Sequence, residues 1–244
     1  MLDVYWWPTE NGKKLAILLE ELGAAYQIIP INIRNGDQLA PAFLKLSPNG
    51  RMPALVDHEP MGGGAPIAIF ESGAIMMYLA EKTARFWPQE PRKKYQVVQW
   101  VLWQCANQGP KFGEQGFFTR NNTPEHGDQS FGIKRFDDEV HRLYGVLNLG
   151  LYRKEFLAAD EYTIADMICY SWTSTWEGRH IDIEEFPNVK LWLARIGARP
   201  AVQRAMSMRL DLLERNVNVE PVELARRKKL LWFQRAQKVP VEWG

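Results

Sequence analysis

The feature that most constrains the fold is a change in the pattern of apolar residues between residues 83 and 92 of this 244-residue chain. Strand-like and helix-like segments alternate before it, whereas only helical spacing follows it. The segment between contains two prolines and has no regular period. We therefore predict an α/β domain at 1–83, a linker at 84–91, an all-helical domain at 92–219 and a C-terminal extension at 220–244.

Within the first domain the predicted order is strand, helix, strand, helix, strand, strand, helix. Aromatic and β-branched runs bounded by Pro and Gly mark the strands, and leucines at helical spacing mark the first helix. Pro30 favours an edge strand or a bulge. The segments, in order, are 2–7, 15–22, 26–33, 41–46, 53–57, 67–70 and the stretch opened by Ser72.

Helix boundaries are also marked in the second domain. Thr163-Ile-Ala-Asp166 has the pattern of a capping box, with Asp in place of Glu, and predicts a helix start. Pro187 and Pro200 each stand where the first turn of a helix is expected to begin.

Charge and cysteine content exclude several classes of protein. Thirty basic and 29 acidic residues leave a formal charge of +1, so we expect no binding to nucleic acid or to a membrane surface. No apolar run reaches the ~20 residues of a membrane span, and the first residues predict no signal peptide. The only cysteines, Cys105 and Cys169, are far apart in the sequence, so we expect no disulfide framework. A chain without disulfides favours a reducing, cytoplasmic location. No metal is predicted.

The turn at 8–12 joins the first strand to the first helix and is a candidate anion site. Free backbone N–H groups and the helix dipole stabilise a thiolate at such a position, and Thr9 and Asn11 add side-chain donors. The alternative is that Thr9 and Asn11 only cap the helix. Tyr5 lies within the predicted strand, which favours a place in the core over a catalytic role.

No cysteine occupies this turn, so the protein has no thiol of its own there to act as a nucleophile. Cys105 and Cys169 fall on predicted helices and are expected to be buried and inert.

Two dipeptides complete the candidate site. Met52-Pro53 directly precedes a predicted strand, which fits either a cis bond that turns the Met52 backbone outward or an ordinary trans proline. Glu71-Ser72 fits either recognition of an α-amino-acid group, by carboxylate and hydroxyl, or a simple helix cap.

Residues 47–57 (SPNGRMPALVD) and 69–82 (IFESGAIMMYLAEK) resemble the glutathione-site motifs of the glutathione transferase superfamily, and 163–166 resembles the capping motif of its helical domain. The resemblance spans both predicted domains. It implies a thioredoxin-like first domain, the glutathione transferase fold, glutathione as co-substrate and a homodimer.

Residues 5–12, Gln38, 71–73 and the Trp-Gln pair at 103–104 are most similar to the nu class, whose members reduce disulfide bonds with glutathione. Glu10 stands where this class leads us to expect proline, and a carboxylate there disfavours thiolate formation. The resemblance also implies a role for Arg135, which reaches glutathione from the helical domain, across a dimer or within one chain.

For the first domain the implied contacts with glutathione follow its three residues. Thr9 and Asn11 lie near the sulfur, Gln38 and Arg51 near the glycine end, Met52 (before Pro53) along the cysteinyl backbone, and Glu71 and Ser72 at the γ-glutamyl group.

The predicted reaction is reduction of small disulfides by a bound glutathione thiolate. Two alternatives stay open: conjugation of glutathione to hydrophobic electrophiles, and a non-catalytic glutathione-binding module. The basic run at 225–229 in the C-terminal extension suggests nucleic acid or membrane contact, but a solvated helix whose apolar side packs on the body or on a partner subunit is favoured.

Overall fold

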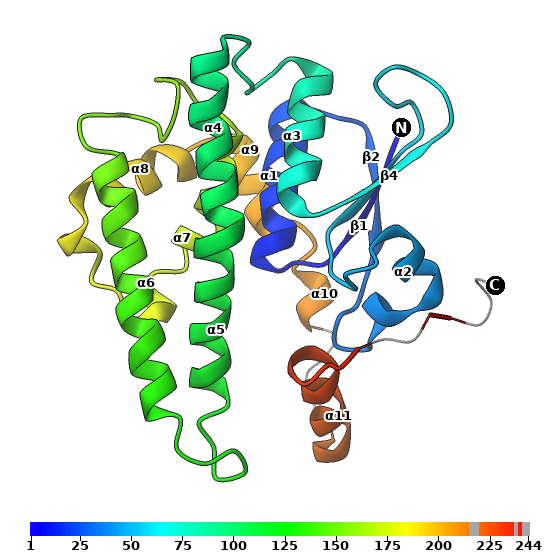
Figure 1. The fold of residues 1–244 in the computed structure, drawn as a ribbon, viewed down its shortest axis with the longest axis vertical. Coiled ribbons are helices and arrows are strands. Elements are labelled where there is room, and N and C mark those ends of the chain that lie inside the picture. Colours follow the sequence, from blue (N-terminus) through cyan, green and yellow to red (C-terminus); the bar gives the residue numbers. More distant parts are fainter. Residues whose placement is uncertain (215–219, 237–238, 241–244) are drawn as a thin grey trace. The chain divides into compact units, whose positions relative to one another are not determined.

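The computed structural model describes residues 1–214, 220–236 and 239–240, which group into two compact units. The first contains residues 1–12, 25–75 and the described chain from Met208 on; the second contains residues 13–24 and 76–207. Figure 1 shows the elements along the chain. Each unit is considered by itself below.

The first unit is built on a four-stranded mixed sheet with the order β2-β1-β3-β4. Its strands are β1 (Leu2–Trp6), β2 (Tyr26–Pro30), β3 (Ala54–Asp57) and β4 (Ile67–Phe70). β1 runs parallel to β2 and antiparallel to β3, and β3 and β4 form an antiparallel pair. The predicted strand at 26–33 is three residues too long, because β2 ends at Pro30, on the sheet edge that this proline favours.

Short helical segments complete this unit: η1 (Asp37–Leu39), α2 (Pro41–Leu46), α10 (Asp211–Glu214) and α11 (Pro221–Trp232). Pro41 and Pro221 occupy first helical turns, where the missing N–H has no helical partner to lose. The parts of the predicted C-terminal extension at 237–238 and 241–244 lie outside the described residues.

Two helices begin in the first unit and continue into the second: α1 (Glu10–Leu22) and α3 (Ser72–Thr83). The start of α1 at Glu10 is earlier than the leucine spacing predicts, so Asn11 and Gly12 belong to its first turn. In α3 the predicted inward face is correct, because its apolar side chains are 0 to 2% exposed: Ile75, Met76, Leu79 and Ala80. The strand and helix order predicted for the first domain is confirmed.

After α3 only helices follow among the described residues. They are α4 (Pro91–Trp103), the π-helical turn η2 (Gln104–Gln108), α5 (Gly109–Arg120), α6 (Ser130–Gly150), α7 (Ile164–Thr173), η3 (Glu177–Arg179), η4 (Ile183–Glu185), α8 (Pro187–Gly197) and α9 (Pro200–Ser207). α5 and α6 lie side by side (Figure 1). The predicted linker at 84–91 begins directly after α3 and ends on Pro91, the first residue of α4. The division into domains at this point stays a prediction.

The capping box predicted at the start of α7 is present and is fully buried. The Thr163 side chain accepts from the first turn, and the Asp166 side chain accepts from the Thr163 N–H at 3.1 Å. Asp166 also accepts from the Leu157 N–H and from Trp192 Nε1, both at 2.9 Å. α7 is buried over its whole length, so this carboxylate joins three segments of the second unit.

Candidate functional site

The β1–α1 turn holds Thr9 at the N-terminus of α1. Thr9 Oγ1 accepts from the Gly12 N–H at 3.3 Å and lies 3.7 Å from Met52 Sδ. The bond from Gly12 shows that Thr9 caps the helix, as one of the alternatives predicted. The contact with Met52 brings the turn next to the Met52-Pro53 segment. Asn11 is half-buried in the first turn of α1.

Gly12 is required by the close packing of this turn. A Cβ at this position would lie 2.1 Å from the Trp7 carbonyl oxygen and 2.7 Å from Trp6 Nε1. Any side chain here would move the turn, and with it the backbone N–H groups at the start of α1.

The Met52–Pro53 peptide bond is cis, which is the first of the two alternatives set by the sequence. Met52 is 7% exposed and Pro53 is buried, immediately before β3. The Ser47 hydroxyl donates to the Arg51 carbonyl oxygen at 2.9 Å and so ties the segment to the end of α2.

Glu71 stands between β4 and α3 with φ of 72°, a left-handed conformation that is uncommon for a glutamate. Its carbonyl oxygen accepts from the Ile75 N–H, while its exposed carboxylate accepts from Asn49 Nδ2 at 3.2 Å. Ser72 is 8% exposed.

Asn49 was not among the residues predicted from the sequence. Asn49 lies in a turn that is closed by a bond from the Gly50 N–H to the Ser47 carbonyl oxygen at 2.8 Å. Gly50 has a φ of 59° in this turn. The Pro-Asn-Gly stretch signals such a turn, but nothing in the sequence predicts which carboxylate the Asn49 amide meets.

The remaining predicted residues differ in exposure. Gln38 is 2% exposed within η1, whereas Arg51 is exposed and donates from Nη1 to the Gly50 carbonyl oxygen at 3.0 Å. Arg135 lies in the second unit, exposed on α6, with Nη1 3.7 Å from a Glu139 carboxylate oxygen. The first unit thus contains all the predicted residues except Arg135.

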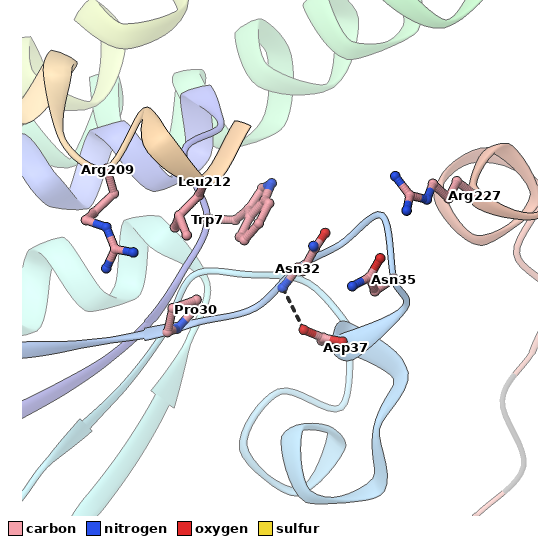
Figure 2. A pocket seen from close by; sticks show the side chains of 8 residues that line it. All are labelled: Trp7, Pro30, Asn32, Asn35, Asp37, Arg209, Leu212 and Arg227. Atoms are coloured by element: carbon pink, nitrogen blue, oxygen red, sulfur yellow. Dashed lines mark hydrogen bonds between the residues drawn. The ribbon is translucent and has the colours of Figure 1, made fainter. Parts of the chain in front are cut away.

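Figure 2 shows a cavity of about 430 Å³ in the first unit, beside the start of the β1–α1 turn. The loop on one wall is held by a bond from the Asn32 N–H to an Asp37 carboxylate oxygen at 2.9 Å. None of the predicted glutathione residues lines it. The lining residues are Trp7, Pro30, Asn32, Asn35, Asp37, Arg209, Leu212 and Arg227.

The two cysteine thiols and the Tyr5 hydroxyl are the protein's own alternatives to a ligand thiol. Cys169 is buried as predicted, and burial raises the pKa of its thiol well above the usual value, whereas Cys105 is half-buried rather than buried. Burial, followed by the charge of Asp3, raises the pKa of Tyr5, which lies within β1 as predicted. Across the described residues no cluster of His, Cys, Asp and Glu is suited to a metal ion, and no helix is long and apolar enough to cross a membrane.

The second unit buries a charged group that sequence reasoning missed. Lys14 is 2% exposed and its Nζ donates to Gln104 Oε1 at 2.6 Å, at the start of the π-helical turn. Further along this turn Gln108 Nε2 donates to Thr173 Oγ1 at 2.8 Å. Pro110 has no N–H to donate to a preceding turn, which accounts for the irregular helix here.

Comparison with protein families gives two matches along the chain. The glutathione S-transferase N-terminal domain matches residues 2–81, and the glutathione S-transferase C-terminal domain matches residues 133–200. Neither match reaches the described segment 220–236.

Among characterised sequences, the chain is 41% identical over 206 residues to the disulfide-bond oxidoreductase YfcG of Escherichia coli, covering 84% of this chain and 94% of that protein. It is 36% identical over 216 residues to the disulfide-bond oxidoreductase YghU of the same organism, covering 83% and 73%.

Solved structures give a consistent result. A glutathione transferase from Pseudomonas putida, with one glutathione disulfide bound per subunit, is 37% identical with a TM-score of 0.79, covering 85% of this chain and 91% of that one. One from Burkholderia graminis, with two glutathione molecules bound per subunit, is 38% identical with a TM-score of 0.80, covering 86% and 88%.

Proposed function

The chain belongs to the glutathione S-transferase family, and from this premise we propose that it reduces small disulfides with the thiolate of a bound glutathione. The observation that carries the proposal is the 3.7 Å contact between Thr9 Oγ1 and Met52 Sδ. It joins the N-terminus of α1, which stabilises an anion, to the Met52-Pro53 segment directly before β3, whose backbone then pairs with the peptide. The named activity of YfcG and YghU supports the same reaction.

Each end of the tripeptide then meets complementary groups. The ammonium of the γ-glutamyl residue meets the Glu71 carboxylate, whose position Asn49 holds, and its carboxylate meets Ser72 at the start of α3. The glycine carboxylate meets Arg51, because guanidinium and carboxylate form paired charge-assisted hydrogen bonds. The sulfur lies near Thr9 and Asn11.

The reaction proceeds in two exchanges. The glutathione thiolate attacks one sulfur of the substrate disulfide, forms a mixed disulfide and releases one substrate thiolate, which takes up a proton. A second glutathione thiolate then attacks the glutathione sulfur of the mixed disulfide. It releases the other substrate thiol and leaves glutathione disulfide, so that two thiols are oxidised for each disulfide reduced.

The test is reduction of hydroxyethyl disulfide by glutathione, run beside conjugation of glutathione to chloro-dinitrobenzene. We expect the disulfide reaction to be the faster one and Asn11→Ala to slow it by about 10-fold, the loss of a hydrogen bond to a charged group. Asn188→Ala, in the second unit, is the matched control and keeps the rate. Faster conjugation would assign a transferase acting on electrophiles, and binding without turnover would assign a non-catalytic module.

We further propose a homodimer in a reducing, cytoplasmic setting, in which Arg135 reaches glutathione from the helical part of either subunit. Its present partner, Glu139, also accepts two hydrogen bonds from Arg142, at 2.9 Å each, and the bond from Arg142 is the main cause that lowers the pKa of Glu139. Sedimentation analysis tests the dimer. Arg135→Ala tests the arginine: weaker glutathione binding supports the role, and unchanged binding rules it out.

A further inference from the structure

The C-terminal segment 220–236, which contains α11, folds back within the first unit onto the loop that carries Gln38. Gly36, with φ of 92°, lies directly beneath Leu230: a Cβ on Gly36 would be 3.2 Å from Leu230 Cδ1. Figure 2 shows Arg227 of α11 across the cavity from Asn35 of the same loop. The segment is therefore packed beside the residues proposed for the glycine end of glutathione.

The first contact is with Gln38. Its Nε2 donates to the Leu230 carbonyl oxygen at 3.5 Å, and the amide of Gln234 donates to the same oxygen. Gln38 Oε1 is buried and has no hydrogen-bond partner among the described residues. A buried acceptor of this kind costs free energy until a donor reaches it.

The second contact is with Arg51. Nη1 of this exposed arginine donates to the Gly50 carbonyl oxygen at 3.0 Å and to Gln234 Oε1 at 2.7 Å. Both of these bonds are made by Nη1. The other two nitrogens of the guanidinium, Nε and Nη2, have no hydrogen-bond partner in the described part of the chain and remain as a pair of parallel donors. That edge of a guanidinium is the one that binds a carboxylate through two bonds.

We propose that Gln234 is a positioning residue for glutathione: it fixes the Arg51 guanidinium so that its free edge receives the glycine carboxylate. This inference rests on the proposed function. A flexible, exposed arginine loses rotamer freedom when it binds a ligand, and a side chain already held in place loses less. The C-terminal segment thus adds selectivity for a peptide that ends in a free carboxylate.

The test compares glutathione with glutathione amide, which lacks the glycine charge, by calorimetric titration of the full-length protein. Gln234→Ala is expected to raise the Kd for glutathione about two- to tenfold, the cost of ordering one long side chain, and to change that for the amide by less than twofold. Gln203→Ala, an exposed glutamine on α9, is the control and changes neither. Gln234→Glu keeps an acceptor for Arg51 but sets a like charge beside the ligand, so it weakens glutathione binding further, and added salt reduces that effect.

An equal effect of Gln234→Ala on both ligands, or no effect on either, overturns the positioning role. If the wild-type protein binds glutathione and its amide equally well, the inference fails while the proposed function stands. If the wild-type protein binds neither ligand, both fail together.

Discussion

The buried carboxylate of Asp166 makes the stability of this protein depend on pH. Asp166 is 0% exposed, and burial raises its pKa from 3.8 to about 6, although the N–H groups of Leu157, Trp192 and Thr163 act in the opposite direction. Between pH 3.8 and 6 the folded state therefore binds a proton that the unfolded state has lost. The resulting stabilisation is complete below the unfolded pKa and is lost as the pH rises through the folded pKa.

The size of the effect follows from the shift. About two pKa units at about 1.4 kcal/mol each give a loss of about 3 kcal/mol between pH 4 and pH 7. Asp166→Asn removes the titration and supplies the reference. Urea unfolding of both proteins across this range should show the free energy of unfolding of the wild type, relative to Asp166→Asn, falling by that amount. A difference that is constant, or that grows with pH, would refute the reasoning.

Three further predictions concern the β1–α1 turn and the surroundings of the Asp166 carboxylate. Gly12→Ala should lower the melting temperature and weaken glutathione binding, because the new Cβ falls 2.1 Å from the Trp7 carbonyl oxygen. The matched control is Gly113→Ala, where a Cβ meets nothing within 4 Å, and it should leave binding intact. Trp192→Phe removes a donor at 2.9 Å from the buried carboxylate and should reduce the free energy of unfolding at pH 7 by about 1–3 kcal/mol, so an unchanged urea midpoint would argue against that bond. Glu10→Gln removes a carboxylate from the first turn of α1 and should raise the disulfide-reduction rate at pH 7 about two- to fivefold; a slower enzyme would show that this charge does not oppose the thiolate.

Much of the fold was predictable because its signals are local. Pro187 and Pro200 open helices as predicted, and the capping box at residues 163–166 depends only on four consecutive residues. The first-domain order could be read from short apolar runs and their breaks. The strand boundary at Pro30 was missed by three residues, since the apolar pattern continues beyond the last strand residue.

The parts of the candidate site that consist of neighbouring residues in the sequence were predictable. The pairs Met52-Pro53 and Glu71-Ser72 stand out in sequence. By contrast, the bond from Asn49 to Glu71 joins residues 22 apart, and that from Arg51 to Gln234 joins residues 183 apart. The burial of Lys14 beside Gln104 is likewise set by tertiary packing, since a lysine in an early helical turn is ordinarily exposed. Contacts between residues so far apart along the chain leave no recognisable pattern in a single sequence.

The measurement that tests the central claim most directly is glutathione-dependent reduction of hydroxyethyl disulfide by a variant with neither cysteine, Cys105→Ala with Cys169→Ala. If the nucleophile is the thiolate of bound glutathione, kcat/KM stays within about twofold of the wild-type value, because no protein thiol takes part in either exchange. A rate that falls to that of glutathione alone, with the variant still folded, would contradict this account and assign the chemistry to one of the protein's own cysteines.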